Sequence, residues 1–306
     1  MKRAAGKVTD AERRLVRLHD KDRLAVERLG VPRAARIGFR LQRDVLAAVR
    51  RGARWPDVRE IIRRAMDQIS RLALDGMILA HLSGTARGLE ADRPVTLSLD
   101  LAPYDEAIAR LRRRLRLTAG VLADLGEKFR PWLFRVTQKT TMAVERQIQQ
   151  ALIETTESGE HVREGVKALR QAFADAGITP QNSFTLENVF RTQTQMAYGA
   201  GRWQAGQDEA IQEILWGYKY VTVGDDRVRP EHVGLDGVTA PKDDGIWSRI
   251  WPPNGFACRC STIEVFTERK IVHPSASVEV DGKEYTPGPD KGFEFNPGQQ
   301  FAPAAT

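Results

Sequence analysis

The spacing of apolar residues changes near residue 215, and this change constrains the fold of the 306-residue chain more than any other feature. Before it, apolar residues recur every three or four positions, as they do in amphipathic helices. After it, Trp216, Tyr218, Tyr220 and Thr222 alternate with other residues, which is typical of a strand rich in aromatic side chains. The sequence therefore predicts an α+β fold, with a mainly helical N-terminal half followed by a small α+β domain that contains a short antiparallel sheet and a long ordered loop.

Capping and breaking residues set the expected bounds of the first helices. Thr9 and Glu12 form a capping box, in which each side chain can bond the other residue's backbone N–H. The helix that they start is expected to end at Gly30 and Pro32, because proline is disfavoured inside a helix. A second helix is then predicted over residues 33–52.

Prolines and glycines also divide the rest of the helical region. Pro56 is expected to open a helix that ends near Gly84, and residues 83–103 have the mixed composition of a loop. Pro131 is expected to break or start a helix. Further helices are predicted over residues 140–157, 160–176 and 184–206.

The helix predicted over residues 184–206 has a clear apolar side. Arg191 and Thr192 are expected to lie away from that side. The residues expected to be buried are Leu186, Val189, Phe190, Met196, Ala197, Ala200 and Trp203.

Short strands and loops are predicted after residue 215. Residues 227–255 are dense in Asp, Gly and Pro, so they are expected to form a long ordered loop. Residues 260–266 have the pattern of a second strand. Residues 278–285 predict a hairpin whose Asp281-Gly282 turn favours the primed type, and the remaining Pro- and Gly-rich stretch is expected to be an extended or poorly ordered tail.

Charge is distributed unevenly along the chain. Residues 1–150 carry a balance of +14 and residues 151–306 a balance of −7, which together give the net charge of +7. Most of the basic residues are arginine, which suits contacts with the phosphates of nucleic acid. The alternative is a genome-wide preference for arginine, with interspersed acidic residues that interrupt any basic patch. The candidate DNA-binding residues are Arg112, Arg113, Arg114 and Arg116.

Several protein classes are disfavoured by composition. No apolar run approaches the roughly 18 residues that a membrane span needs, so no membrane association is expected. The first residues lack the apolar core of a secretory signal, and two cysteines cannot build a disulfide scaffold. A cytoplasmic soluble protein is the simplest expectation.

Both cysteines, Cys258 and Cys260, lie in the stretch GFACRC. Residues i and i+2 of an extended chain are at the outer limit of disulfide geometry, so a disulfide between them is not expected. They could bind zinc with His232, with Asp236 or Asp243 as a fourth ligand, although C-x-C is a weaker zinc signal than C-x2-C. The alternative is that both are small buried residues near His232 and that the protein has no cofactor.

Catalytic arrangements can also be drawn in the loop. Cys258 or Cys260 with His232 and Asp225 would resemble a cysteine triad. Basic residues of the loop, with Asp225 and Asp226 holding a metal, would resemble a nuclease cluster. Any loop with this many polar residues permits such arrangements, so the sequence favours a protein that is not an enzyme and keeps a metal-dependent, nuclease-like enzyme as the alternative.

An ordered set of motifs carries a resemblance to a known family. The set resembles the phage Mu F-like head morphogenesis (minor head) proteins over roughly residues 140–300. The N-terminal 140 residues resemble that family only in being helical. The motifs are Phe190-Arg191-Thr192, Gly201-Arg202, Asp226-Arg227 with His232, Leu235-Asp236-Gly237, Trp251-Pro252-Pro253, Gly255-Phe256-Ala257-Cys258-Arg259-Cys260 and a tail over residues 292–298.

The resemblance implies a minor capsid protein of a tailed phage or prophage. Such proteins associate with the portal protein and other head proteins, act in procapsid assembly or in DNA packaging and delivery, and lie in the phage head after assembly in the host cytoplasm. No catalytic set is transferred with the resemblance. Arg191, Asp226, Arg227, His232, Asp236, Cys258 and Cys260 are therefore interpreted as motif residues.

The sequence predicts three regions. Residues 1–139 form a basic helical region, residues 140–268 a Mu F-like domain, and residues 269–306 a hairpin followed by a Pro- and Gly-rich tail. DNA binding without a role in assembly stays an alternative function for the basic region.

Overall fold

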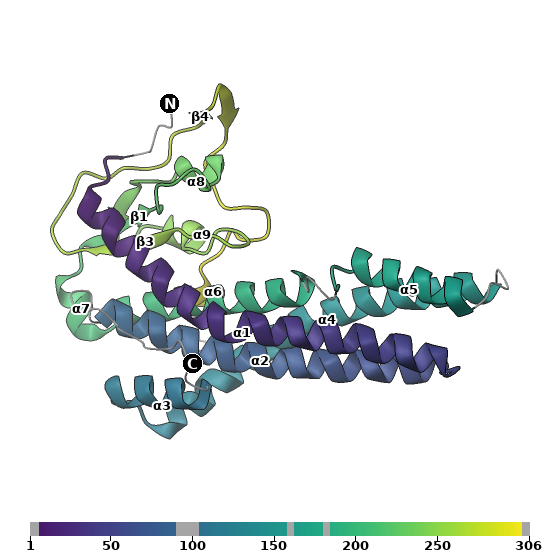
Figure 1. The fold of residues 1–306 in the computed structure, drawn as a ribbon. Helices are drawn as coiled ribbons and strands as arrows, with labels where there is room; N and C mark the ends of the chain where they lie inside the picture. The colour runs from purple at the N-terminus through teal and green to yellow at the C-terminus, as the bar shows by residue number, and fades with distance from the viewer. Residues whose placement is uncertain (1–5, 90–103, 158–161, 180–183, 302–306) are drawn as a thin grey trace. The chain divides into compact units, whose positions relative to one another are not determined.

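The computed structural model describes residues 6–89, 104–157, 162–179 and 184–301 (Figure 1). It confirms the α+β class, with long helices in the N-terminal part and a small antiparallel sheet in the C-terminal part. No helix in the described ranges is both long enough and apolar enough to cross a membrane.

The long helices are α1 (Asp10–Arg50), α2 (Trp55–Leu89), α3 (Tyr104–Arg114), α4 (Ala119–Glu157), α5 (Val162–Asp175) and α6 (Phe184–Gly206). The short elements are α7 (Glu209–Ile214), β1 (Gly217–Val221), α8 (Pro230–Val233), β2 (Thr239–Pro241), α9 (Trp247–Ile250), β3 (Ser261–Val265), β4 (Val278–Val280), β5 (Lys283–Tyr285) and α10 (Pro297–Gln300).

The chain forms two compact units, each built from segments that are far apart in sequence. The sheet unit contains residues 1–26, 77–119 and 194–306, and the helical unit contains residues 27–76 and 120–193. Helices α1, α2 and α6 contribute residues to both units. The three regions expected at 1–139, 140–268 and 269–306 divide the sequence differently, and that division stays a prediction.

Helix α1 begins as predicted but does not end at Gly30 and Pro32. Thr9 and Glu12 form the capping box, with Thr9 N donating to Glu12 Oε2 at 2.7 Å. The helix then continues through Pro32 to Arg50, so the predicted end is wrong. Gly30 serves close packing instead, because a Cβ there would lie 1.8 Å from Cζ of Phe190. The missing hydrogen bond of one proline does not outweigh the burial of the residues around it.

Pro131 is likewise inside a helix, so the predicted break or start there is wrong. Helix α4 runs without interruption from Ala119 to Glu157, and Phe129 and Leu133, on either side of the proline, are buried. Packing of this apolar stripe decides the helix, as it does in α1. Residues 83–89, which were expected to be part of a loop, are the last turns of α2. The rest of that expected loop, residues 90–103, lies outside the described residues.

Helix α6 has the bounds that the sequence predicts. Of the seven residues expected to be buried, six are buried and Trp203 is half-buried. Thr192 is also buried, which contradicts the expectation that it lies elsewhere. The reason is that α6 is covered on more than one side, so the polar residues Gln193, Thr194 and Gln195 are buried as well.

Glycines let α6 and the last turns of α2 approach closely within the sheet unit. A Cβ on Gly84 would lie 2.3 Å from the carbonyl oxygen of Tyr198. A Cβ on Gly201 would lie 2.1 Å from the carbonyl oxygen of His81, and one on Gly88 would lie 2.3 Å from Cβ of Ala205. The two helix backbones are therefore in direct contact.

The three-stranded sheet has the order β2-β1-β3 and is antiparallel throughout. Gly217 of β1 pairs with Pro241 of β2 and with Val265 of β3. Because side chains alternate along a strand, the two faces of the sheet differ. One face carries an aromatic cluster, and the other carries a valine cluster that includes Val16 of α1. The aromatic cluster contains Trp203, Tyr218, Tyr220, Trp247 and Trp251, several of them in edge-to-face contact.

The end of the chain is more ordered than the sequence predicts. The hairpin of β4 and β5 is confirmed, and Asp281 and Gly282 have the positive φ angles, 51° and 77°, of a primed turn. The extended or poorly ordered tail expected after it is wrong for residues up to 301. Phe293 and Phe301 are buried, and Asn296 donates to the carbonyl oxygen of Trp247 at 3.1 Å.

Candidate metal centre

His232, Cys258 and Cys260 meet in the sheet unit. Both sulfur atoms lie 3.8 Å from Nδ1 of His232, and all three potential ligand atoms lie within 4.8 Å of one another. The side chains are buried, with residue exposures of 1%, 2% and 7%. Both cysteines are free thiols. The structure thus confirms that no disulfide joins them and that they lie beside the histidine.

Two short backbone features place these side chains. Helix α8 begins at Pro230, as is common at a first helical position, and it carries His232. A turn precedes Cys258, whose N–H donates to the carbonyl oxygen of Gly255 at 3.2 Å. Ala257 in this turn has φ of 52°, a conformation that costs a non-glycine residue about 1–2 kcal/mol. Such a cost persists only where the surrounding structure fixes the backbone.

The second ring nitrogen of His232 faces oxygen atoms. Its Nε2 lies 3.1 Å from the carbonyl oxygen of Asn254 and 3.3 Å from Oδ1 of Asp290. An Nε2–H donated to these acceptors leaves Nδ1 with a lone pair directed at the sulfur atoms. Gly255 makes room for the carboxylate, because a Cβ there would lie 2.1 Å from Oδ2 of Asp290.

Asn254 holds this loop against the sheet. Its side-chain amide donates to the hydroxyl oxygen of Tyr220 at 3.1 Å and to the carbonyl oxygen of Ile250 at 3.0 Å. Trp251 donates from Nε1 to the carbonyl oxygen of Gly199 at 3.0 Å. The geometry of the loop thus depends on bonds to α6 and β1 as well as on the cysteines.

The charges of the three groups are strongly coupled. A hydrogen bond from Cys260 holds the pKa of Cys258 well below its ordinary value, against the effect of burial and with help from His232. The same bond, together with burial, raises the pKa of Cys260. Burial alone would lower the pKa of His232, but the bond to Cys258 and the charges of Cys258 and Asp290 raise it. The thiolate form of Cys258 and the protonated form of His232 are thus each stabilised by the other group.

The two aspartates considered as a fourth ligand lie elsewhere. The carboxylate of Asp236 accepts from the N–H of Thr222 at 2.8 Å and from Arg13 at 2.7 Å. Asp243 is exposed. Within the described part of the chain, the metal-ligand cluster consists of His232 and the two cysteines.

The motif residues Asp226 and Arg227 are both exposed, and the neighbouring Asp225 makes the strong contact instead. Asp225 accepts two hydrogen bonds of 2.6 Å from Arg259, and these bonds hold its pKa below the usual value. Arg259, which lies between the two cysteines, is thus bound to the residues that begin the loop.

The remaining predicted site residues lie outside this cluster. Arg191 belongs to the helical unit, where it pairs with Glu27 at 3.4 Å and with Glu187 at 3.8 Å. The four candidate DNA-binding arginines lie at the end of α3 and just after it. Arg112 is half-buried, and the exposed members are Arg113, Arg114 and Arg116.

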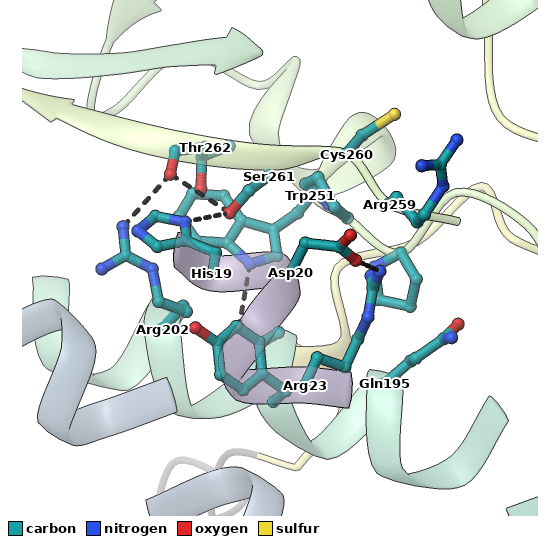
Figure 2. A pocket seen from close by; sticks show the side chains of 14 residues that line it. His19, Asp20, Arg23, Gln195, Arg202, Trp251, Arg259, Cys260, Ser261 and Thr262 are labelled. Carbon is teal, nitrogen blue, oxygen red and sulfur yellow. Dashed lines mark hydrogen bonds and ion pairs between the residues drawn. The ribbon is translucent and has the colours of Figure 1, made fainter. Parts of the chain in front are cut away.

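Sequence reasoning did not find a group of residues from α1 that supports the cysteine segment. His19 Nδ1 lies 2.7 Å from the hydroxyl of Ser261, and Arg23 donates to the carbonyl oxygen of Cys258. His19, Arg23 and Ser261 line a cavity of about 20 Å³, which is room for about one water molecule. Figure 2 shows the sulfur of Cys260 directed away from this cavity. Arg202 lines another side of this cavity and donates to Oε1 of Glu264 at 2.7 Å.

Comparison with known proteins identifies the region that contains this cluster. Residues 146–263 match the family described as Phage Mu protein F like protein. The chain is 40% identical over 75 residues to the "Putative capsid assembly protein F" of Escherichia phage Mu, which is 24% of this chain and 17% of that protein. It is 32% identical over 111 residues to the Mu-like prophage FluMu F protein of Haemophilus influenzae, which is 35% of this chain and 26% of that protein.

These matches confirm the resemblance over residues 146–263, which include His232 and both cysteines. The matched segments span about a quarter or less of each relative's own length. No solved structure matches the chain.

Proposed function

Because residues 146–263 carry the region shared by phage Mu protein F like proteins, we propose that this chain is a head morphogenesis protein of a tailed phage or prophage. The observation that carries the proposal is the match to a protein named for capsid assembly, at 40% identity over 75 residues. The chain would act in procapsid assembly or DNA packaging and be retained in the phage head.

The contacts of the motif residues support a structural role. Asp236 and Arg259 tie the loop to other segments by ion pairs, and Trp251 bonds α6. The thiols and His232 are buried under the loop, so a bulky substrate has no direct approach to them. A metal-dependent enzyme, the alternative function, is therefore less well supported than a protein whose shared region maintains a fold.

Association with the portal and other head proteins is the finer part of the proposal. Helix α4 in the helical unit exposes three large apolar residues, Phe134, Met142 and Ile153, with exposures of 65%, 55% and 47%. At 100° per residue these positions fall within about 100° of one another around the helix. Exposed apolar side chains on one side of a helix offer separate contact points for another protein.

Non-specific DNA contact is proposed for the basic region. Residues 1–150 carry +14, and the end of α3 exposes Arg113, Arg114 and Arg116. Filter binding across a salt series tests this contact, because phosphate binding must weaken as salt rises. Affinity that is independent of salt, or unchanged after the three arginines become glutamine, would contradict it.

Co-expression tests the assembly role. The chain is produced together with the portal, scaffolding and major capsid proteins of the phage or prophage that encodes it, and particles are purified by sedimentation. We expect the chain to co-sediment with portal-containing procapsids, and we expect its omission to reduce correctly formed heads in electron micrographs. A triple change of Phe134, Met142 and Ile153 to serine is expected to abolish co-sedimentation. Lys139→Ser with Gln147→Ser, a change of two exposed polar residues of the same helix, is the matched control and should not abolish it. Normal heads without the chain would refute the proposal.

A further inference from the structure

We propose that His232, Cys258 and Cys260 bind one zinc ion, with Nδ1 and the two Sγ atoms as ligands. The ion would join α8 to the segment that enters β3 and so fix both ends of the long loop. This proposal concerns a binding site and is independent of the role in head assembly.

The distances between the potential ligand atoms fit tetrahedral coordination. With Zn–N bonds of about 2.0–2.1 Å and Zn–S bonds of about 2.3 Å, neighbouring ligands of a tetrahedron lie about 3.5–3.8 Å apart. The two measured N–S distances are both 3.8 Å. The two sulfur atoms lie no more than 4.8 Å apart, so closure onto an ion requires them to approach each other by at most about 1 Å.

The donor atoms select the class of metal. Two thiolates and an imidazole are soft or intermediate ligands, which suit zinc, whereas calcium and magnesium prefer oxygen. A doubly charged ion is neutralised by two thiolates, so the complex carries no net charge. This matters because Cys258 and Cys260 lie in the aromatic core cluster, where an uncompensated charge would be unfavourable.

The surroundings of His232 have the form expected beside a metal. A histidine ligand usually donates its other ring N–H to a carbonyl or carboxylate, which orients the ring and strengthens the metal bond. Here the acceptors are the carbonyl oxygen of Asn254 and Oδ1 of Asp290. Gly255 leaves the space that this carboxylate occupies. The site therefore includes a support that a simple buried cysteine pair would not need.

One coordination position remains after the three ligands from the described residues. Zinc sites with three protein ligands carry a water molecule in that position. We assign the fourth position to water, and burial of the three ligands indicates that the ion acts mainly in holding the loop.

Metal analysis of the full-length chain tests the proposal. The protein is purified without chelators, incubated with zinc, desalted and measured by plasma mass spectrometry. One zinc ion per chain is expected, and a mercurial thiol reagent should release it stoichiometrically. Cobalt loading should give thiolate-to-cobalt absorption in the near ultraviolet. Cys258→Ser, Cys260→Ser and His232→Asn should each lose the ion, whereas His273→Asn, a change of an exposed histidine, should keep it.

A second variant examines the support around the histidine. Asp290→Asn leaves all three ligands in place and should weaken zinc affinity by about 10–100-fold in competition with a chromophoric chelator. Folded wild-type protein with clearly substoichiometric zinc would overturn the proposal, as would zinc that the mercurial reagent does not release. If the ligand variants do not fold, these two measurements on the wild-type chain decide the outcome.

Discussion

The contact between α2 and α6 predicts that Gly201→Ala destabilises the protein, although alanine is the better helix former. In an exposed helix the change would add about 1 kcal/mol of stability. Here the new Cβ would lie 2.1 Å from the carbonyl oxygen of His81, 2.9 Å from its carbonyl carbon and 3.0 Å from the backbone nitrogen of Thr85. All three atoms belong to the backbone of α2, so no side-chain rotation relieves the overlap.

The expected magnitude follows from the two opposing effects. Inserting a methyl group into a filled contact costs about 1–3 kcal/mol, and a contact with rigid backbone belongs at the upper end of that range. After subtraction of the propensity gain, we expect a net loss of about 1–2 kcal/mol. Urea unfolding followed by circular dichroism measures this as a lower midpoint.

Gly126→Ala is the matched control, because Gly126 also lies inside a long helix, α4, but has nothing within 4 Å of the added Cβ. This variant should be more stable than wild type by about 0.5–1 kcal/mol. The diagnostic result is that the two glycine-to-alanine changes alter the free energy of unfolding in opposite directions. If Gly201→Ala proves as stable as Gly126→Ala, the close approach of α2 and α6 is refuted.

Three further predictions concern buried groups in the sheet unit. Burial and the nearby cation Arg202 hold the pKa of His19 well below its ordinary value, so the folded protein keeps this ring neutral while the unfolded chain protonates near pH 6.5. The contribution of His19 to stability should therefore be full above pH 6.5 and fall by up to about 1.4 kcal/mol per pH unit below it. His19→Gln should remove this contribution to the pH dependence in urea titrations at several pH values. In the wild type, the carboxylate of Asp22 lies 2.7 Å from the buried guanidinium of Arg87. Asp22→Asn removes this negative charge and should lower the free energy of unfolding by about 3–5 kcal/mol. A thermal melt equal to that of wild type would contradict this prediction. Ala257→Gly should raise the stability of metal-free protein by about 1 kcal/mol by removing left-handed strain, and an unchanged or lower unfolding midpoint would count against it.

Elements with strong local signals could be predicted from the sequence. Helix α6 has a periodic apolar side, and the β4–β5 hairpin has an Asp-Gly turn, so both were expected with nearly correct bounds. Pro32 and Pro131 misled the prediction because burial of the flanking residues outweighs the loss of one backbone hydrogen bond. Local preference is decisive only where tertiary packing does not oppose it.

The same contrast applies to the candidate site. The approach of His232 to the cysteines was predicted, because a strand after the loop brings both ends of that loop together. The contributions of Asp290 and Gly255 were not predicted. A glycine that leaves space for a distant carboxylate has no local sequence pattern that would reveal this role. Nor was the bond from Arg23 to the carbonyl oxygen of Cys258, which joins residues 235 positions apart.

The pairing of the first part of α1 with the last third of the chain has a consequence for biosynthesis. Arg13 bonds Asp236 and His19 bonds Ser261, across 223 and 242 positions. At about 5–20 residues per second, a ribosome needs roughly 10–50 s to deliver the second partner after the first. During that interval Val16 and its neighbours have no sheet to cover. The sheet unit can therefore be completed only after translation of the strand at residues 261–265, and a fragment limited to residues 146–263 would emerge without the helix that closes its core.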